Sequence, residues 1–230
     1  MSNGLCRSAG PVLGDIMKKL AGITALVATA TPALAHHPLG GLPMETFTHG
    51  LLSGAGHPVL GFDHLFFVIA IGVAALFTSA RFLTPAAYIL AMLAGCALTT
   101  AGLPLPLSEP VIALSLLVLG GLVVSGRALT IGAAIVVFAG FGLFHGSAFG
   151  SSIAGQEGSV GGTVFLGYLL GLGVVQYLLA LAAGWVAQTL LGATQAHTVN
   201  ARLIGAMVAG TGAFLCLEAA EGPLLALIFG

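Results

Sequence analysis

His57-Pro-Val-Leu-Gly-Phe-Asp63-His64 is the stretch that decides the fold, because it places two imidazoles and a carboxylate at the start of an uncharged run from Leu65 to Ala80. A charge at membrane depth costs at least about 2.5 kcal/mol on insertion scales, so it is kept only where it faces a partner, a cavity or an ion. Imidazole and carboxylate together suit divalent nickel, cobalt and zinc. The stretch therefore predicts a metal site at one mouth of a membrane protein.

The composition supports an integral membrane protein without reference to any motif. Charged residues make up 6% of the 230-residue chain, where a soluble domain carries roughly 25%. The 35 glycines are consistent with this class, since small residues let transmembrane helices approach closely. A net charge of −1 argues against nucleic-acid binding, which needs a basic face.

Residues 1–35 have the pattern of a cleaved signal peptide. Met17-Lys-Lys19 is a basic segment, a short apolar stretch follows it, and Ala33-Leu-Ala35 is typical of a cleavage site. Cleavage would leave His36 at the new N-terminus. An uncleaved anchor helix is the alternative, although the apolar stretch falls short of the ~20 residues that span a bilayer. The sequence leaves open whether translation begins at Met1 or at Met17.

Six apolar segments then predict an all-α, polytopic bundle with six transmembrane helices in residues 58–230. Residues 36–57 are predicted to form a His-rich outer segment with a short re-entrant or interfacial helix. With the N-terminus and the C-terminus both outside, Arg81, Arg127 and Arg202 all fall in cytoplasmic loops, as the positive-inside rule requires. The six segments are 58–79, 85–101, 109–124, 129–149, 163–190 and 203–220.

The histidines segregate toward the outer side in this topology. Only His197 of the seven lies in a cytoplasmic loop, whereas scattered structural histidines have no reason to gather at one side. Carboxylates raise the local concentration of cations and neutral imidazoles coordinate them, so the distribution favours a metal-collecting entrance. The candidate metal ligands are His57, Asp63, His64, His145, Glu109, His36 and His37.

The spacing of the first motif gives a local geometry. Pro58 is a favoured first helical residue, which predicts His57 at the N-cap of the first transmembrane helix. His57 and His64 are then nearly on one face, while Asp63 is rotated about 100° from His64. One residue of the Asp63/His64 pair is expected to bind the ion while the other orients a neighbour.

The third and fourth segments supply the remaining candidates. His145 stands in Phe144-His145-Gly146, where a neighbouring glycine lets an ion or another backbone approach the ring. Ser108 and Glu109 begin the third segment, and this pair has two interpretations. Ser108 is a good N-cap and Glu109 suits the helix dipole, or Glu109 contacts the metal.

Taken together, these motifs resemble those of the HupE/UreJ family of nickel and cobalt permeases. The matching elements are His57-x-x-x-Gly61-x-Asp63-His64, Phe144-His145-Gly146-x-Ala148 and the Ser108-Glu109 start. Many members carry a second histidine, in the pattern HGxAHG, where this chain has Phe149. That departure resembles the cyanobacterial-type branch, for which cobalt is a plausible cargo.

The resemblance implies uptake of Ni²⁺ or Co²⁺ across the bacterial inner membrane, with the ion as cargo and no permanently bound cofactor. The chain has no G-x-x-x-x-G-K-[ST] sequence, so we expect that it does not hydrolyse ATP. No ATPase subunit is evident in this chain. Facilitated diffusion and proton coupling both stay open. Zinc transport is the nearest alternative. A membrane metalloenzyme is a second alternative, but no H-E-x-x-H is present and we expect no enzyme. A haem-binding membrane protein is a third.

Overall fold

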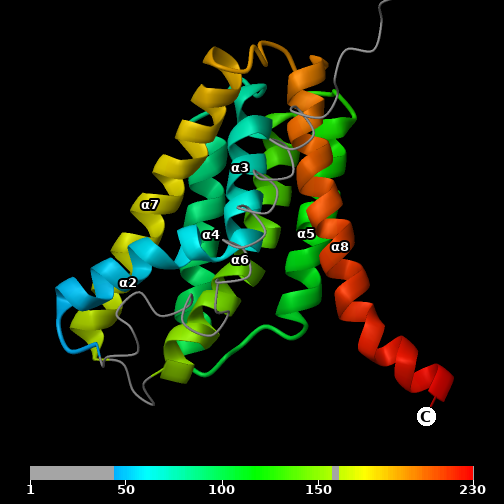
Figure 1. The fold of residues 1–230 in the computed structure, drawn as a ribbon. Helices are drawn as coiled ribbons and strands as arrows, with labels where there is room; N and C mark the ends of the chain where they lie inside the picture. The colour runs from blue at the N-terminus through cyan, green and yellow to red at the C-terminus, as the bar shows by residue number, and fades with distance from the viewer. Residues whose placement is uncertain (1–43, 157–160, 230) are drawn as a thin grey trace, which may run out of the picture. The chain divides into compact units, whose positions relative to one another are not determined.

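The computed structural model describes residues 44–156 and 161–229, all within the compact unit His37–Gly230. These residues form seven helices and no strand, which confirms the all-α class (Figure 1). The expected signal peptide, the expected cleavage site and both His36 and His37 lie outside the described residues. The helices are α2 (Phe47–Leu60), α3 (Phe62–Leu76), α4 (Leu83–Thr100), α5 (Ser108–Val124), α6 (Ile131–Gln156), α7 (Gly162–Thr189) and α8 (Val199–Phe229).

Four of the described helices, namely α4, α6, α7 and α8, are individually long and apolar enough to cross a membrane. A fifth span results if α2 and α3 are counted together, although the two helices meet at a bend of 80°. Helix α5 is apolar but has 17 residues, about 25 Å, slightly less than the roughly 30 Å of a bilayer core. The described residues therefore contain four helices of full span length, or five spans with the bent pair, and not six straight ones.

The break between α2 and α3 corrects the expected first transmembrane helix. Pro58 lies inside α2, and His57 is in its last turn, so His57 is not an N-cap. The helix begins earlier, because the Thr46 side chain accepts a hydrogen bond from the His49 N–H. Gly61 ends α2 and precedes α3 with an extended backbone. His57 and His64 therefore belong to different helices and do not share one helix face.

This break determines how deep the motif lies. Helix α3 has 15 residues, about 22 Å, so it does not reach from one end of the bundle to the other. It begins partway along α4 and α6, and α2 runs outward from that point to pack along α7 (Figure 1). The first turn of α3, with Asp63 and His64, is thereby placed inside the bundle.

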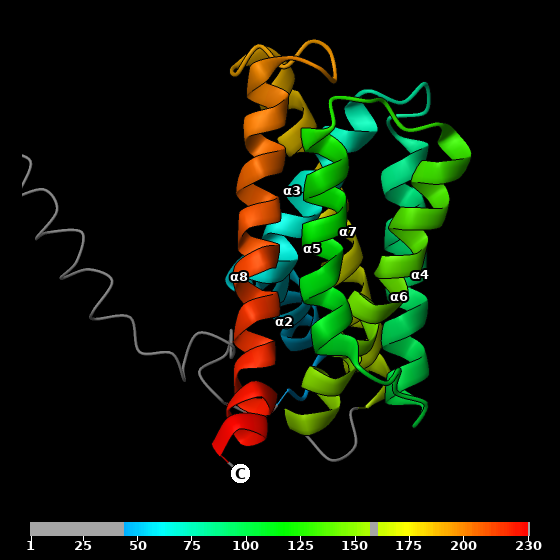
Figure 2. The same cartoon turned by 90° about the vertical axis from the view of Figure 1, so that its right-hand side faces the viewer.

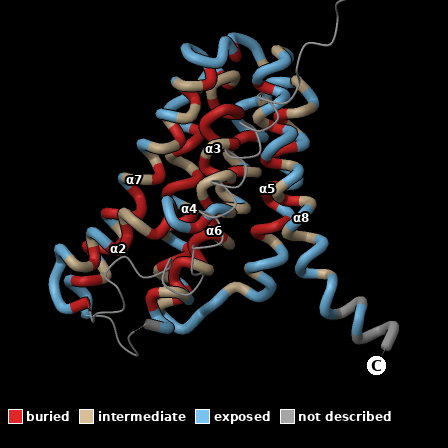
Figure 3. The backbone as a smooth tube through the Cα atoms, viewed as in Figure 1, coloured by how far each residue is buried: buried red, intermediate tan, exposed pale blue. Residues whose placement is uncertain are grey.

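Three helix pairs, α4 with α6, α2 with α7 and α5 with α8, make the most extensive contacts. Their closeness depends on glycine: a Cβ at Gly146 in α6 would lie 1.9 Å from the Met92 carbonyl oxygen in α4. No side chain fits there, since real Cβ contacts never fall below about 3 Å. Buried residues recur along the sides of these helices that face one another and are sparse in α8 (Figure 3).

The connections alternate between the two ends of the bundle. The segments joining α3 to α4, α5 to α6 and α7 to α8 lie at one end, and the segment joining α4 to α5 lies at the other (Figures 1 and 2). Arg81 and Arg127 are in the first group, and the Arg202 Nε donates to the Val124 carbonyl at 2.8 Å. We call this end of the bundle the arginine end.

The start of α5 differs in detail from the expectation. Leu107, with φ of 57°, occupies the N-cap position in the left-handed region, and Ser108 is the first helical residue. The Ser108 hydroxyl donates back to the Leu105 carbonyl at 2.9 Å, so it does not cap the helix. Glu109 lies in the first turn, as expected. A carboxylate in the first turn suits the helix dipole, so this interpretation of Glu109 agrees with its position.

Candidate functional site

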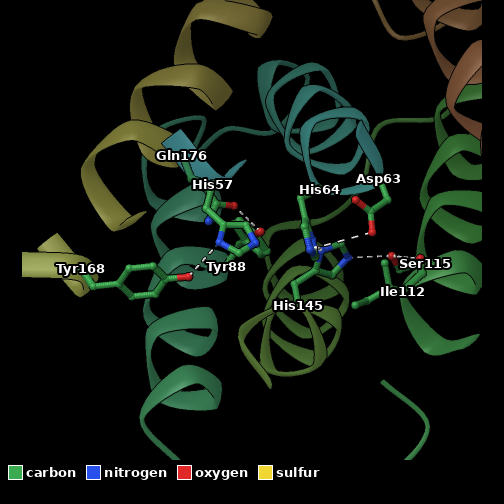
Figure 4. Close-up of polar contacts among 9 residues, drawn as sticks. All are labelled: His57, Asp63, His64, Tyr88, Ile112, Ser115, His145, Tyr168 and Gln176. Carbon is green, nitrogen blue, oxygen red and sulfur yellow. Dashed lines mark hydrogen bonds and ion pairs between the residues drawn. The ribbon is translucent and has the colours of Figure 1, made fainter. Parts of the chain in front are cut away.

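The centre of the candidate site is a contact between two buried histidines on different helices. The Nδ1 atoms of His64 in α3 and His145 in α6 are 2.8 Å apart (Figure 4). His145 has no exposed surface, and eleven residues of α6, roughly 16 Å, separate it from the helix end at Gln156. The expected approach of His145 to the Asp63-His64 pair is therefore found, and it lies well inside the bundle.

Neighbouring side chains fix the two rings in place. The His145 ring stacks on Phe67 with centroids 4.2 Å apart and an interplanar angle of 17°. The His64 ring lies against Phe149 with centroids 4.2 Å apart. Gly61 leaves room beside the same ring, because a Cβ there would lie 3.0 Å from His64 Cδ2. Phe67 and Phe149 thus give the contact between the two imidazoles apolar walls, and electrostatic interactions are stronger in such surroundings than in water.

Ser115 in α5 determines which nitrogen of His145 carries the proton. Its Oγ lies 2.6 Å from the Ile112 carbonyl oxygen and 2.9 Å from His145 Nε2. A carbonyl only accepts, so the single hydroxyl hydrogen goes to Ile112, and Ser115 Oγ must accept from His145 Nε2–H. In a neutral ring this leaves a lone pair on Nδ1, which accepts the Nδ1–H of His64.

The same hydrogen-bond directions determine which nitrogen of His64 carries a lone pair near Asp63. With its Nδ1 donating to His145, neutral His64 presents a lone pair at Nε2, which is 3.8 Å from Asp63 Oδ2. The Asp63 carboxylate is partly exposed, unlike the two rings. A nitrogen lone pair and a carboxylate oxygen at this spacing attract a cation, because both are electron-pair donors. Figure 4 shows Ser115 and Asp63 on the same side of the two overlapping imidazole rings.

His57 belongs to a neighbouring group. It lies in the last turn of α2, where Tyr168 of α7 places its hydroxyl 3.3 Å from His57 Nδ1 (Figure 4). The Phe149 ring lies between the two parts of the site, with its centroid 5.1 Å from that of His57 and 4.2 Å from that of His64. The structure thus brings both halves of the first motif around one phenylalanine.

Glu109 is exposed at the start of α5, about 9 Å along the helix axis from Ser115. Within residues 44–156 and 161–229, no group of three or more His, Cys, Asp and Glu side chains is close enough to hold a metal ion. The histidine pair and Asp63 are therefore the candidate residues that approach each other most closely. His36 and His37 lie outside the described residues.

Sequence reasoning missed two residues of this site, Ser115 and Tyr168. The available signal for Ser115 was a lone serine in an otherwise apolar run between Pro110 and Ser125. A second buried hydrogen bond between helices lies nearby: Gln176 Oε1 of α7 accepts from the Tyr88 hydroxyl of α4 at 2.6 Å (Figure 4).

The apolar helices of bilayer length, packed around buried imidazoles, define the class as a polytopic helical membrane protein. The chain belongs to the HupE / UreJ protein family, whose sequence profile matches residues 24–215. Protein HupE of Rhizobium leguminosarum bv. viciae is 30% identical over 191 residues, which cover 79% of this chain and 96% of that protein. No solved structure is significantly similar to the chain.

Proposed function

We propose that this protein is a permease for uptake of a divalent transition metal ion, Ni²⁺ or Co²⁺, across the bacterial inner membrane. The observation that carries the proposal is the buried His64 and His145 pair, with Asp63 beside it, inside a bundle of apolar helices. Imidazoles and a carboxylate are kept at such depth where they serve a cargo, since burying them is otherwise costly. The resemblance of the motifs to nickel and cobalt permeases supports the same cargo.

The first binding position of the ion is between His64 Nε2 and Asp63 Oδ2. These atoms are 3.8 Å apart, so an ion at about 2.1 Å from each would have an N–metal–O angle of about 130°. Waters complete its coordination, because no third ionisable ligand of the described residues is in place. A site with few protein ligands binds weakly enough to release its ion, as conduction requires.

His145 has two roles in this scheme. While Ser115 holds its Nε2–H, His145 orients His64 through the Nδ1 contact, as partners behind metal-bound imidazoles do. An ion moving inward displaces the proton between the two Nδ1 atoms, since ligands must present lone pairs to a metal, and this proton passes to the vacated Nε2 of His64. The two rings move apart in this step, because 2.8 Å is too short for a metal in line between the two nitrogens. His145 then becomes a ligand on the path toward the arginine end.

The arginine end faces the cytoplasm in this proposal. Arg81, Arg127 and Arg202 gather there, and the positive-inside rule places such residues on the cytoplasmic side. Both termini of the mature chain are then outside, after removal of a signal peptide from residues 1–35. Glu109 lies at the opposite end, where its negative charge attracts cations toward the entrance.

The test is a metal-uptake assay that compares nickel, cobalt and zinc in cells without importers of their own. We expect His64→Ala, His145→Ala and Asp63→Ala to abolish most uptake while the protein stays in the membrane. His197→Ala is the matched control, because His197 is exposed and lies in the connection from α7 to α8. Uptake at the normal rate by all three site variants would refute the proposal.

The assay and a spectrum of the purified protein also separate the alternatives. Zinc uptake above nickel and cobalt would assign zinc as the cargo, which imidazole and carboxylate do not exclude by affinity order. A Soret band would indicate haem, whose iron needs axial ligands. The 2.8 Å between the Nδ1 atoms of His64 and His145 leaves no room for an iron in line between them, since two opposite ligands at about 2 Å would be about 4 Å apart.

A further inference from the structure

A cavity of about 220 Å³ lies at the arginine end, away from the histidine pair. It is formed where α3 and the start of α4 meet α7. Its floor is apolar and includes Gly72, Leu76 and Gly184, while Arg81, Trp185 and Gln188 are the polar or amphipathic residues of its lining. Neither the metal site nor its proposed path accounts for these residues.

The two helices that form this floor cross at glycines. A Cβ at Gly72 of α3 would lie 2.0 Å from the Ala180 carbonyl oxygen of α7. A Cβ at Gly184 of α7 would lie 2.9 Å from the Gly72 carbonyl oxygen. The backbones of α3 and α7 are thus in contact at this crossing, and both glycines line the cavity.

The charge of the cavity excludes the cargo and favours an anion. Arg81 carries a permanent positive charge, and its guanidinium carbon is 4.8 Å from the centroid of the neighbouring Phe82 ring. Trp185 adds an indole N–H donor and Gln188 an amide. Among the described residues, the lining contains no Asp, Glu or His to offset the charge of Arg81 or to coordinate a metal.

We propose that this cavity binds one anionic phospholipid of the surrounding bilayer, with its phosphate at Arg81 and an acyl chain on the apolar floor. Trp185 is 59% exposed, as suits a tryptophan at the level of the headgroups. Cavities of about 300–1,000 Å³ enclose small molecules, so about 220 Å³ fits a headgroup and the start of one chain, with the rest of the lipid outside. Basic pockets between helices on the cytoplasmic side recognise anionic lipid in this way.

Arg127 offers a matched comparison at the same end of the bundle. It also lines a hollow, with Ala74, Phe77 and Leu122 among its neighbours, but that space measures only about 10 Å³. Both arginines contribute equally to the general positive charge of this end. Of these two arginines, only Arg81 adjoins a space that can take up part of a lipid.

The test is native mass spectrometry of the full chain extracted from vesicles of equal phosphatidylglycerol and phosphatidylcholine, without added metal. We expect the parent to retain phosphatidylglycerol and Arg127→Gln to retain the same amount. Arg81→Gln should retain about fivefold less, because this is the factor that one arginine contributes to the binding of anionic lipid.

Three results would overturn the proposal. Equal losses in the Arg81 and Arg127 variants would mean that the general charge of this end attracts lipid. Equal retention of the two lipids by the parent would mean that no anion is recognised. Displacement of the lipid by millimolar inorganic phosphate would make the free anion the ligand. None of these readouts uses metal uptake, so each is independent of the proposed transport function.

Discussion

His64 Nδ1 and His145 Nδ1 lie 2.8 Å apart, although 81 positions separate the two residues in the chain. The contact requires that one ring donates and the other accepts, and Ser115 sets the direction by taking the Nε2–H of His145. A chain of hydrogen bonds thus runs from the Ile112 carbonyl in α5 through α6 to the first turn of α3. The lone pair on His64 Nε2 therefore depends on Ser115, at the far end of this chain of hydrogen bonds.

Replacing Ser115 by Ala should reduce metal uptake by about tenfold, the lower end of what loss of a partner behind a ligand costs. Without Ser115, His145 is no longer fixed with its proton on Nε2. Uptake kinetics measure the loss, and ¹⁵N NMR of labelled histidine detects the change of tautomer. Ser125→Ala is the control, since Ser125 makes the same bond to a carbonyl three residues back, at 2.6 Å, but is exposed. Full activity of the Ser115 variant with the His145 tautomer unchanged would disprove the role.

Phe149→His should change the order of preference among nickel, cobalt and zinc. The new imidazole would stand between His57 and His64, whose ring centroids are 5.1 Å and 4.2 Å from that of Phe149. Competition between pairs of metals in the uptake assay measures the preference. Phe149→Leu separates the gain of a ligand from the loss of the phenyl ring. If both variants kept the parent's preference, Phe149 would have no part in selecting the cargo.

Gly146→Ala should destabilise the protein by about 1–3 kcal/mol, the usual cost of overpacking. Its methyl group would lie 1.9 Å from the Met92 carbonyl oxygen and would push α4 and α6 apart. Thermal unfolding in detergent reports the change. Gly140→Ala on the same helix is the control, because nothing lies within 4 Å of a Cβ there. Equal stability of the two variants would contradict the packing of α4 against α6.

Leu103→Cys should react with a membrane-impermeant thiol reagent from outside, and Ser125→Cys only after the cytoplasmic face is opened. Leu103 lies in the connection from α4 to α5 and Ser125 in the connection from α5 to α6, at opposite ends of the bundle. The native cysteines Cys6, Cys96 and Cys216 are first replaced by Ala. External labelling at Ser125→Cys would reverse the proposed orientation.

The sequence by itself determined the class of protein, the all-α fold and the family motifs. Charged residues are too rare for a soluble surface, and long uncharged runs need no tertiary information to indicate helices in a membrane. The helices α4, α5 and α7 begin and end within two residues of the expected bounds, whereas α6 continues seven residues past the expected end at Phe149. The metal ligands and the orientation in the membrane stay predictions.

Only the tertiary structure decided how the motif is arranged. Pro58 signalled a helix start, yet the chain turns by 80° after it at Gly61, because packing of α2 on α7 outweighs the local preference. That turn begins α3 inside the bundle and brings His64 to His145. Ser115 and Tyr168 joined the site for the same reason: contacts between distant segments follow from helix packing, which the spacing of residues along the chain does not encode.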